Sequence, residues 1–350
     1  MSIAHLTMTA DIYDFSIEDW YVADPSSDGG KDPLTNPPPS PFPTEQECPL
    51  TPFTPALTPV TVIEDCEPKV VSISTAFNLV THTAEPDLVF YATDGVLFYA
   101  DTKIIAKNSP DAFKALISAT SSPSGDAEYE SLGSMKIIPV QESSVILNII
   151  LHTVYGTSCA EFAPTFEALV EAVCRMPLYD ISPSTHITRN THLYFALLAY
   201  APLYPLDLYA LAGHFKIHDL AVATSSHLLS CSLSSITEEM AERIGTLYLM
   251  RLFNLHFTRC TALKDLLLAP PQLHPFTEEC SFDDQKCLTR AWAFVSAYLA
   301  WDARADLSIH SMNLVFSPLA ADLTCSHCKK SLETKTHDVV AQWASLKCTI

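Results

Sequence analysis

The feature of this sequence that most constrains its fold is a pair of short apolar runs that meet at an Asp-Gly dipeptide. Residues 87–117 read DLVFYATDGVLFYADTKIIAKNSPDAFKALI, and the runs on either side of Asp94 and Gly95 are followed at once by a helical pattern. Asp-Gly between apolar runs predicts a β-hairpin, because a type I′ turn requires positive φ at both central residues. The stretch therefore predicts a hairpin that leads directly into helices.

Two further segments extend this pattern downstream. Residues 136–140 form a third apolar run that predicts a strand, and residues 142–155 show helical periodicity that ends at Tyr155 and Gly156. A small sheet accompanied by helices is an α+β arrangement.

The order of these parts resembles the BTB (POZ) domain, an interaction module. The likeness rests on Asp87 before the first strand, Phe98 in the second, and Ser109 preceding Phe113 in the small helices. It covers roughly residues 85–230, of which residues 205–229 resemble the helical pair that completes the module, and the whole chain resembles the BTB-domain proteins of fungi. The resemblance implies a small sheet with surrounding helices, followed by an all-α region.

One departure from the family pattern concerns a charged pocket. The family usually places a His and then a basic residue after the second strand, whereas this chain has Asp101 and Thr102, with Lys103 only afterwards. In BTB transcription factors that basic residue and an acid of the first strand line a dimer pocket, so the pocket does not carry over and Asp87 is expected to be a structural acid. The resemblance implies a dimer or core face made by Asp87, Phe98, Ile104, Ile105, Phe113 and Leu116.

Composition excludes several classes of partner. The chain of 350 residues has 40 acids against 20 bases and a net charge of −20, with no basic stripe. Neutralising phosphates requires clustered Lys and Arg, so we expect no direct nucleic-acid or membrane partner. Its 8 glycines form neither a dinucleotide-binding nor a P-loop motif.

Cysteine usage and the first residues predict a reducing compartment, cytoplasmic or nuclear. The 11 cysteines are an odd number, and the start MSIAHLTMTADIYDF has neither a basic nor a long apolar region of a secretory signal. The longest near-apolar run, residues 193–212, is interrupted by Pro202, Pro205 and Asp207, which favours a buried helix pair over a membrane span.

Residues 1–85 differ in kind from the rest and are predicted to form a disordered tail. Acids far outnumber lysines there, and about half of all prolines fall within it. Thr51, Thr54 and Thr58 each precede Pro and are candidates for proline-directed phosphorylation. Residues 11–22, DIYDFSIEDWYV, suit a docking or activation-type motif, with a plain acidic terminus as the alternative.

Residues 233–350 show helical periodicity, which predicts an all-α region. Thr237 is the expected cap of one helix, Pro270, Pro271 and Pro275 end the run, and a second helix is expected over residues 283–302. The predicted organisation is therefore a tail over 1–85, a BTB-like domain over 86–232 and a helical region over 233–350.

One spacing is typical of metal sites. Cys325 and Cys328 could supply half of a tetrahedral zinc site, but closure requires a second pair. The nearby candidates Cys280 with Cys287, or His310 with His337, have no matching spacing. The default interpretation is reduced structural thiols at a helix start, so no metal ligand and no cofactor are assigned.

Catalytic motifs are absent from the sequence. It contains neither G-x-S-x-G nor H-E-x-x-H, and its Asp pairs flank apolar helical patterns as solvated helix ends do. His214, His218 and His227 fall on a Leu/Ala-rich helical segment, where buried hydrogen-bonded histidines are common. We therefore assign no catalytic residue.

Two functions from different classes remain open. The first is a non-catalytic BTB-type module that forms homodimers and recruits proteins, with a cullin-type ubiquitin ligase as one potential partner, although residues 126–132 offer no clear cullin-binding motif. The alternative is a transcriptional regulator that acts through the acidic aromatic residues 11–22 and touches DNA only through partners.

Overall fold

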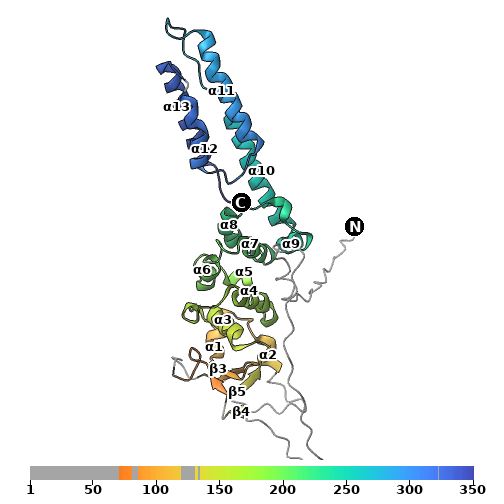
Figure 1. Cartoon of the computed structure of the whole chain (residues 1–350). Coiled ribbons are helices and arrows are strands. Elements are labelled where there is room, and N and C mark those ends of the chain that lie inside the picture. The colour runs from red at the N-terminus through yellow and green to blue at the C-terminus, as the bar shows by residue number, and fades with distance from the viewer. Residues whose placement is uncertain (1–70, 81–85, 120–130, 133–134, 322) are drawn as a thin grey trace, which may run out of the picture. The chain divides into compact units, whose positions relative to one another are not determined.

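The computed structural model describes residues 71–80, 86–119, 131–132, 135–321 and 323–350, which form an α+β arrangement of one small mixed sheet and many helices (Figure 1). The strands are β1 Ser72–Ile73, β2 Leu88–Tyr91, β3 Val96–Ala100, β4 Ser131–Leu132 and β5 Met135–Pro139. The helices are α1 Thr102–Asn108, α2 Lys114–Ala119, α3 Ser144–Tyr155, α4 Phe166–Arg175, α5 Pro183–His186, α6 His192–Leu198, α7 Pro205–His214, α8 His218–Ser225, α9 Glu238–Ile244, α10 Thr246–Leu268, α11 Phe282–Trp301, α12 Ile309–Phe316 and α13 Ser326–Ser345.

The described strands form one sheet in the order β1-β3-β2-β5-β4. Strands β2 and β3 are the predicted antiparallel hairpin, with Phe90 opposite Phe98, and β5 is the predicted third strand, which runs parallel to β2 with Ile138 beside Phe90. A parallel neighbour cannot be reached by a tight turn, and α1 and α2 lie in the connection between β3 and β5.

The hairpin forms where predicted, but its turn is not type I′. Gly95 has φ of 84°, whereas Asp94 is not among the described residues with positive φ. The Gly95 N–H donates to the Ala92 carbonyl at 3.0 Å, as in a type I turn followed by a left-handed residue. The Asp94 carboxylate instead accepts hydrogen bonds from the backbone N–H and hydroxyl of Ser144, at 3.1 and 2.6 Å, and so caps the first turn of α3.

Helix α3 confirms the predicted helix of residues 142–155, with a start two residues later. Gly156 ends it with φ of 69°, and its N–H donates to the last-turn carbonyls of His152 and Thr153. The helix is apolar on most sides because it packs against both α1 and α4, and its Ile149, Ile150 and Leu151 are fully buried.

The predicted end of the tail at residue 85 lies too late. β1 pairs in parallel with β3, and the Ser72 and Ser74 N–H groups donate to carbonyls of Gly95 and Leu97. Phe77 is buried, with its ring edge-on to Tyr155 at 5.2 Å between centroids. Residues 72–77 therefore belong to the sheet-containing part. The other predictions on residues 1–70, including Thr51, Thr54, Thr58 and residues 11–22, lie outside the described residues.

The predicted boundary at residues 232–233 does not separate two packing units. Helix α9 packs against α7, and a Cβ added to Gly213 on α7 would lie 2.4 Å from the Ile244 carbonyl oxygen. The Tyr209 hydroxyl on α7 also donates to the Tyr248 carbonyl of α10, at 2.8 Å. Glycine allows this close helix approach. The sheet-containing part thus continues through α9 into the start of α10.

The second half of α10 begins a separate helical core. Leu263 and Leu267 of α10 pack in one buried cluster with residues of α11, α12 and α13, among them Trp292, Phe316 and Trp343. Both helix predictions made for residues 233–350 are confirmed. The Thr237 side chain accepts a hydrogen bond from the third N–H of α9, and α11 spans Phe282–Trp301.

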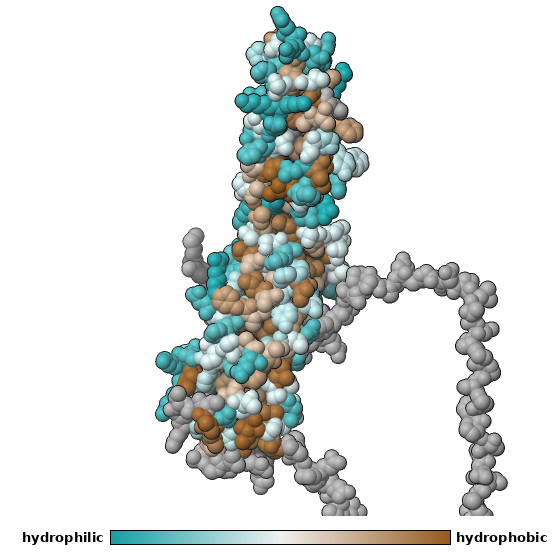
Figure 2. Space-filling view, turned by 60° about the vertical axis from the view of Figure 1, so that its left-hand side comes forward, coloured by the Kyte–Doolittle hydropathy of each residue, from teal (hydrophilic) through white to brown (hydrophobic). Residues whose placement is uncertain are grey.

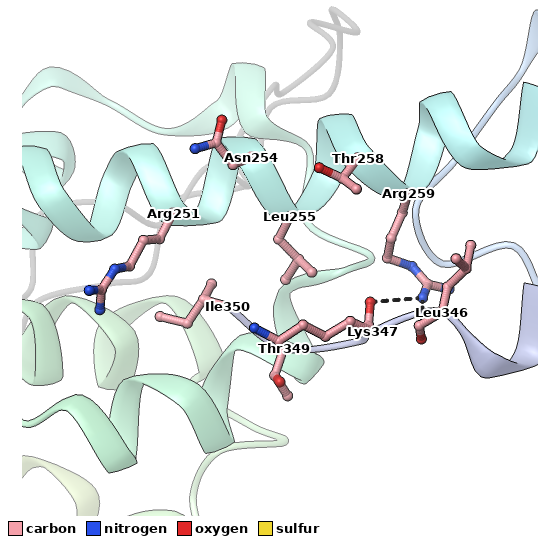
Figure 3. Close-up of a pocket in the computed structure, with 9 residues that line it drawn as sticks. All are labelled: Arg251, Asn254, Leu255, Thr258, Arg259, Leu346, Lys347, Thr349 and Ile350. Atoms are coloured by element: carbon pink, nitrogen blue, oxygen red, sulfur yellow. Dashed lines mark hydrogen bonds between the residues drawn. The ribbon is translucent and has the colours of Figure 1, made fainter.

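Arg259 of α10 holds the end of this helical region in place, as Figure 3 shows. Its buried guanidinium donates to the carbonyls of Ala305, Leu346 and Lys347 at 2.8, 3.1 and 3.1 Å. The same group lies over the Trp343 ring at 4.3 Å. One side chain thus fixes three segments that are distant in sequence.

Candidate functional site

Three of the six residues assigned to a dimer or core face belong to the core. Phe98, Ile105 and Phe113 are almost fully buried. The Phe113 ring packs 4.7 Å from Phe90 and 5.0 Å from Tyr179, between centroids. Since buried side chains cannot contact a second protein unless the domain unfolds, these residues stabilise the interior of the sheet-containing part. Ile104 on α1 and Leu116 on α2 are half-buried.

Asp87, expected from the sequence to be a structural acid, is hydrogen-bonded to the start of α1. Its carboxylate accepts hydrogen bonds from the backbone N–H and the hydroxyl of Thr102, at 2.9 and 2.5 Å. Asp101 is the N-cap of α1 and accepts from the Lys103 N–H at 2.7 Å. The two acids therefore anchor the start of α1, as anions at helix N-termini do.

Tyr155 of α3 also contacts this corner, because its hydroxyl oxygen accepts a hydrogen bond from the Asp101 N–H at 2.8 Å. Burial raises the pKa of the Tyr155 hydroxyl to about 12.

A surface hollow of about 380 Å³ lies between β1, β3 and the first turns of α3. Three apolar side chains on its wall are exposed: Ile73 at 52%, Val145 at 54% and Phe162 at 42%. On the face that Figure 2 presents, apolar surface is divided into several patches between hydrophilic residues. We call the hollow and these three side chains the β1–α3 groove.

Asn148 contributes an unpaired acceptor to the β1–α3 groove. Its side chain is only 8% exposed, and its Oδ1 has no hydrogen-bond partner among the described residues. A buried carbonyl oxygen without a donor costs about 1–3 kcal/mol. The groove therefore has three exposed apolar side chains on its wall, whereas the unpaired Asn148 oxygen is itself buried.

The backbone of β1 adds to the same surface. β1 is at one edge of the described sheet, and the Ser72 and Ser74 N–H groups point toward β3. Because direction alternates along a strand, the N–H and carbonyl of Ile73 point away from the sheet. Such an edge can accept a further strand.

The buried carboxylate of Glu142, just before α3, is paired with groups at the end of α4. The Glu142 carboxylate accepts from the Tyr179 hydroxyl at 3.2 Å and lies 3.6 Å from the Arg175 guanidinium. Burial raises the pKa of Glu142, and the Arg175 charge opposes that shift. Since Tyr179 also packs on Phe113, this cluster cross-links the core, and perturbed pKa values also arise in such structural networks.

Four potential metal ligands meet in the C-terminal helical region. The structure brings Cys280 and His274 to Cys325 and Cys328, the pair whose spacing is typical of metal sites. The ligand atoms of these four residues all lie within 4.8 Å of one another. Cys287, His310 and His337 are not part of this group. We call these four residues the Cys₃His cluster.

Hydrogen bonds and burial distinguish the three thiols of the cluster. Backbone N–H groups of Cys328 and His327 at the start of α13 lower the pKa of Cys325 to about 7. Burial raises the pKa of Cys280 and, to about 12, that of Cys328. The described cysteines are all free thiols.

Sequence reasoning missed His274 because its spacing fits no metal motif. It lies in the Pro-rich connection between α10 and α11, whose residues Thr277 and Cys280 form a tight bridge. That bridge turns the chain back so that His274 and Cys280 face one site. The sequence offered one signal for this ligand: His274 lies within the Pro-rich residues 270–275, six positions before Cys280.

No described helix combines the length and the apolar composition needed to cross a lipid bilayer. No family model matches this sequence, and no curated protein or solved structure gives a match either.

Proposed function

We propose that this protein is a non-catalytic interaction protein of the BTB type, which self-associates and recruits other proteins. The element order supports it: a hairpin, two small helices, a strand parallel to the first hairpin strand, and then the α3–α4 pair and the α7–α8 pair. This is the order that the resemblance of residues 85–230 implies.

The single observation that carries the proposal is the β1–α3 groove. Exposed Ile73, Val145 and Phe162 form an apolar surface beside an open strand edge, and Asn148 leaves an acceptor unpaired there. Association that buries these three side chains gains free energy from the apolar area removed from water.

The occupant that we propose for the groove is a second copy of the chain. In a twofold pair the same surface meets itself, so each apolar wall faces another apolar wall. The three apolar side chains favour such a partner over a charged peptide, because burying a charge against apolar groups is costly.

The test is the oligomeric state of the full chain. We expect light scattering coupled to gel filtration to give a dimer at micromolar concentration, and Ile73→Asp or Val145→Asp to give a monomer. Phe195→Asp is the matched control, because Phe195 on α6 is equally exposed but lies outside the groove. A wild-type chain that stays monomeric at every concentration would refute the proposal.

The recruited partner is a separate question that a pull-down decides. Affinity purification of the full chain, compared with a version that lacks residues 1–70, would recover a cullin with both versions if the chain is a ligase adaptor. Partners lost together with residues 1–70 would indicate the transcriptional alternative.

A further inference from the structure

The Cys₃His cluster gathers residues from two separate segments of the chain, the α10–α11 connection and the start of α13. His274 comes from the connection after α10, Cys280 precedes the N-cap Ser281 of α11, and Cys325 and Cys328 lie at the start of α13. Two of the thiols, Cys280 and Cys328, are buried within the helical core that contains Leu288 and Leu332, and Cys325 packs against that core. Apolar packing alone would place leucine-like side chains there.

Three distances between ligand atoms of the cluster match those of a tetrahedral metal shell. Zn–S bonds of about 2.3 Å and Zn–N bonds of about 2.0–2.1 Å place sulfurs about 3.8 Å apart, and sulfur about 3.5 Å from nitrogen. The Sγ atoms of Cys280 and Cys328 are 3.8 Å apart. The His274 Nε2 lies 3.3 Å from the Cys325 Sγ and 3.4 Å from the Cys328 Sγ.

The histidine is oriented as a metal ligand. Its Nδ1 lies 2.6 Å from the Pro275 carbonyl oxygen, which can only accept, so Nδ1 carries the proton and Nε2 presents a lone pair to the thiols. A backbone carbonyl on the far ring nitrogen is the usual arrangement for a zinc-bound histidine. One lone pair cannot accept a good hydrogen bond from two thiols, whereas one metal ion would bind all three groups.

We propose that the Cys₃His cluster binds one zinc ion, which joins the α10–α11 connection to the start of α13. Three thiolates and one imidazole in a tetrahedron select zinc over the oxygen-preferring cations. Four protein ligands close the shell and leave no position for water or substrate, so the site is structural. The proposal concerns residues outside the β1–α3 groove and is independent of the proposed function.

The first test measures binding by the intact chain. We expect native mass spectrometry of the reduced, purified protein to show one zinc per chain. Cobalt(II) in its place should give the strong d–d bands of tetrahedral thiolate coordination. A reduced chain that takes up no zinc, or a Cys280–Cys328 disulfide in protein kept reduced throughout purification, would overturn the proposal.

Matched variants identify the ligands. His274→Asn and Cys280→Ser should weaken zinc binding at least tenfold in competition with a chelator. His327→Asn and Cys287→Ser are the controls, because His327 lies between the two α13 thiols and Cys287 lies on exposed α11 surface, yet neither joins the cluster. Equal affinity in His274→Asn and wild type would contradict the assignment.

A measurement on the wild-type chain tests the proposal even if the ligand variants fail to fold. Chelator added to the intact chain should increase hydrogen exchange in α11 and α13 and leave β2 and α3 unchanged, and added zinc should reverse the effect. Exchange in α13 that does not respond to chelator would contradict a structural zinc site.

Discussion

The sheet-containing part and the C-terminal helical region are stabilised by different kinds of interaction. In the first, the largely buried helix α3 packs against α1 and α4, the strand residues Leu88, Val89, Phe90 and Ile138 are buried, and large rings fill the interior. In the second, four helices share a smaller core, and polar devices join their ends: the Arg259 guanidinium at one place and the Cys₃His cluster at another. Small cores commonly require such cross-links.

The largest effect that would test this contrast is expected at Trp292. Its ring stacks on Phe316 at 5.1 Å and its indole N–H donates to the Leu267 carbonyl at 3.1 Å. We expect Trp292→Ala to lower the free energy of unfolding of the helical region by about 3–5 kcal/mol. Denaturation followed by hydrogen exchange should place the loss in α11–α13. Phe90→Ala is the matched variant in the sheet, where it should lower the stability of the sheet-containing part. If either variant lowered the free energy of unfolding of both regions equally, the two regions would share a single core.

A smaller effect is expected at Arg259, the polar link of the helical region. Arg259→Met keeps the apolar stem and the contact with Trp343 but leaves the Ala305, Leu346 and Lys347 carbonyls without their donor. Hydrogen bonds to a charged group contribute about 1.5–3 kcal/mol, and we expect a loss of that order by urea denaturation. Arg290→Met, on exposed α11 surface, should have little effect. A loss as small as that of Arg290→Met would mean that packing alone holds the end of the chain.

The smallest expected effect is a pH dependence of the sheet-containing part. Burial lowers the pKa of His152, whose Nδ1 lies 2.7 Å from the Thr157 hydroxyl. A lowered pKa means that the folded state favours neutral His152, so its contribution is present above the unfolded pKa of about 6.5 and is lost as pH falls through the folded pKa. Burial raises the pKa of Glu142, and its contribution has the opposite sign, present at acid pH and lost as pH rises.

The measurement is the stability of the α3 amides between pH 7 and pH 5. We expect wild type to lose at most about 1.4 kcal/mol per pH unit from this histidine, and His152→Gln to show a flatter profile. Identical slopes in the two proteins would exclude His152 as the titrating group.

Local patterns were sufficient for much of this fold. Gly95 and Gly156 marked a turn and a helix end, and the cap at Thr237 was visible as a polar residue before two acids. Short-range rules identify such features because their hydrogen bonds lie within a few residues.

What the sequence did not reveal depends on contacts between distant segments. β1 has two residues, too few for a periodic pattern, and is held only by its pairing with β3. The exposed walls of the β1–α3 groove look like ordinary core residues in sequence. His274 approaches Cys328 across 54 residues, a pairing that no local spacing encodes.

The continuity of α10 has a consequence for how this protein can be cut. Its Leu252 and His256 are buried near the sheet-containing part, where His256 lies 2.9 Å from the Leu228 carbonyl oxygen, while Leu263 and Leu267 belong to the other core. An uninterrupted helix of 23 residues offers a protease no ready point of entry between the two. Within residues 246–350, limited digestion should therefore nick the connection after Leu268 before it cuts α10, so that the N-terminal product keeps all of α10.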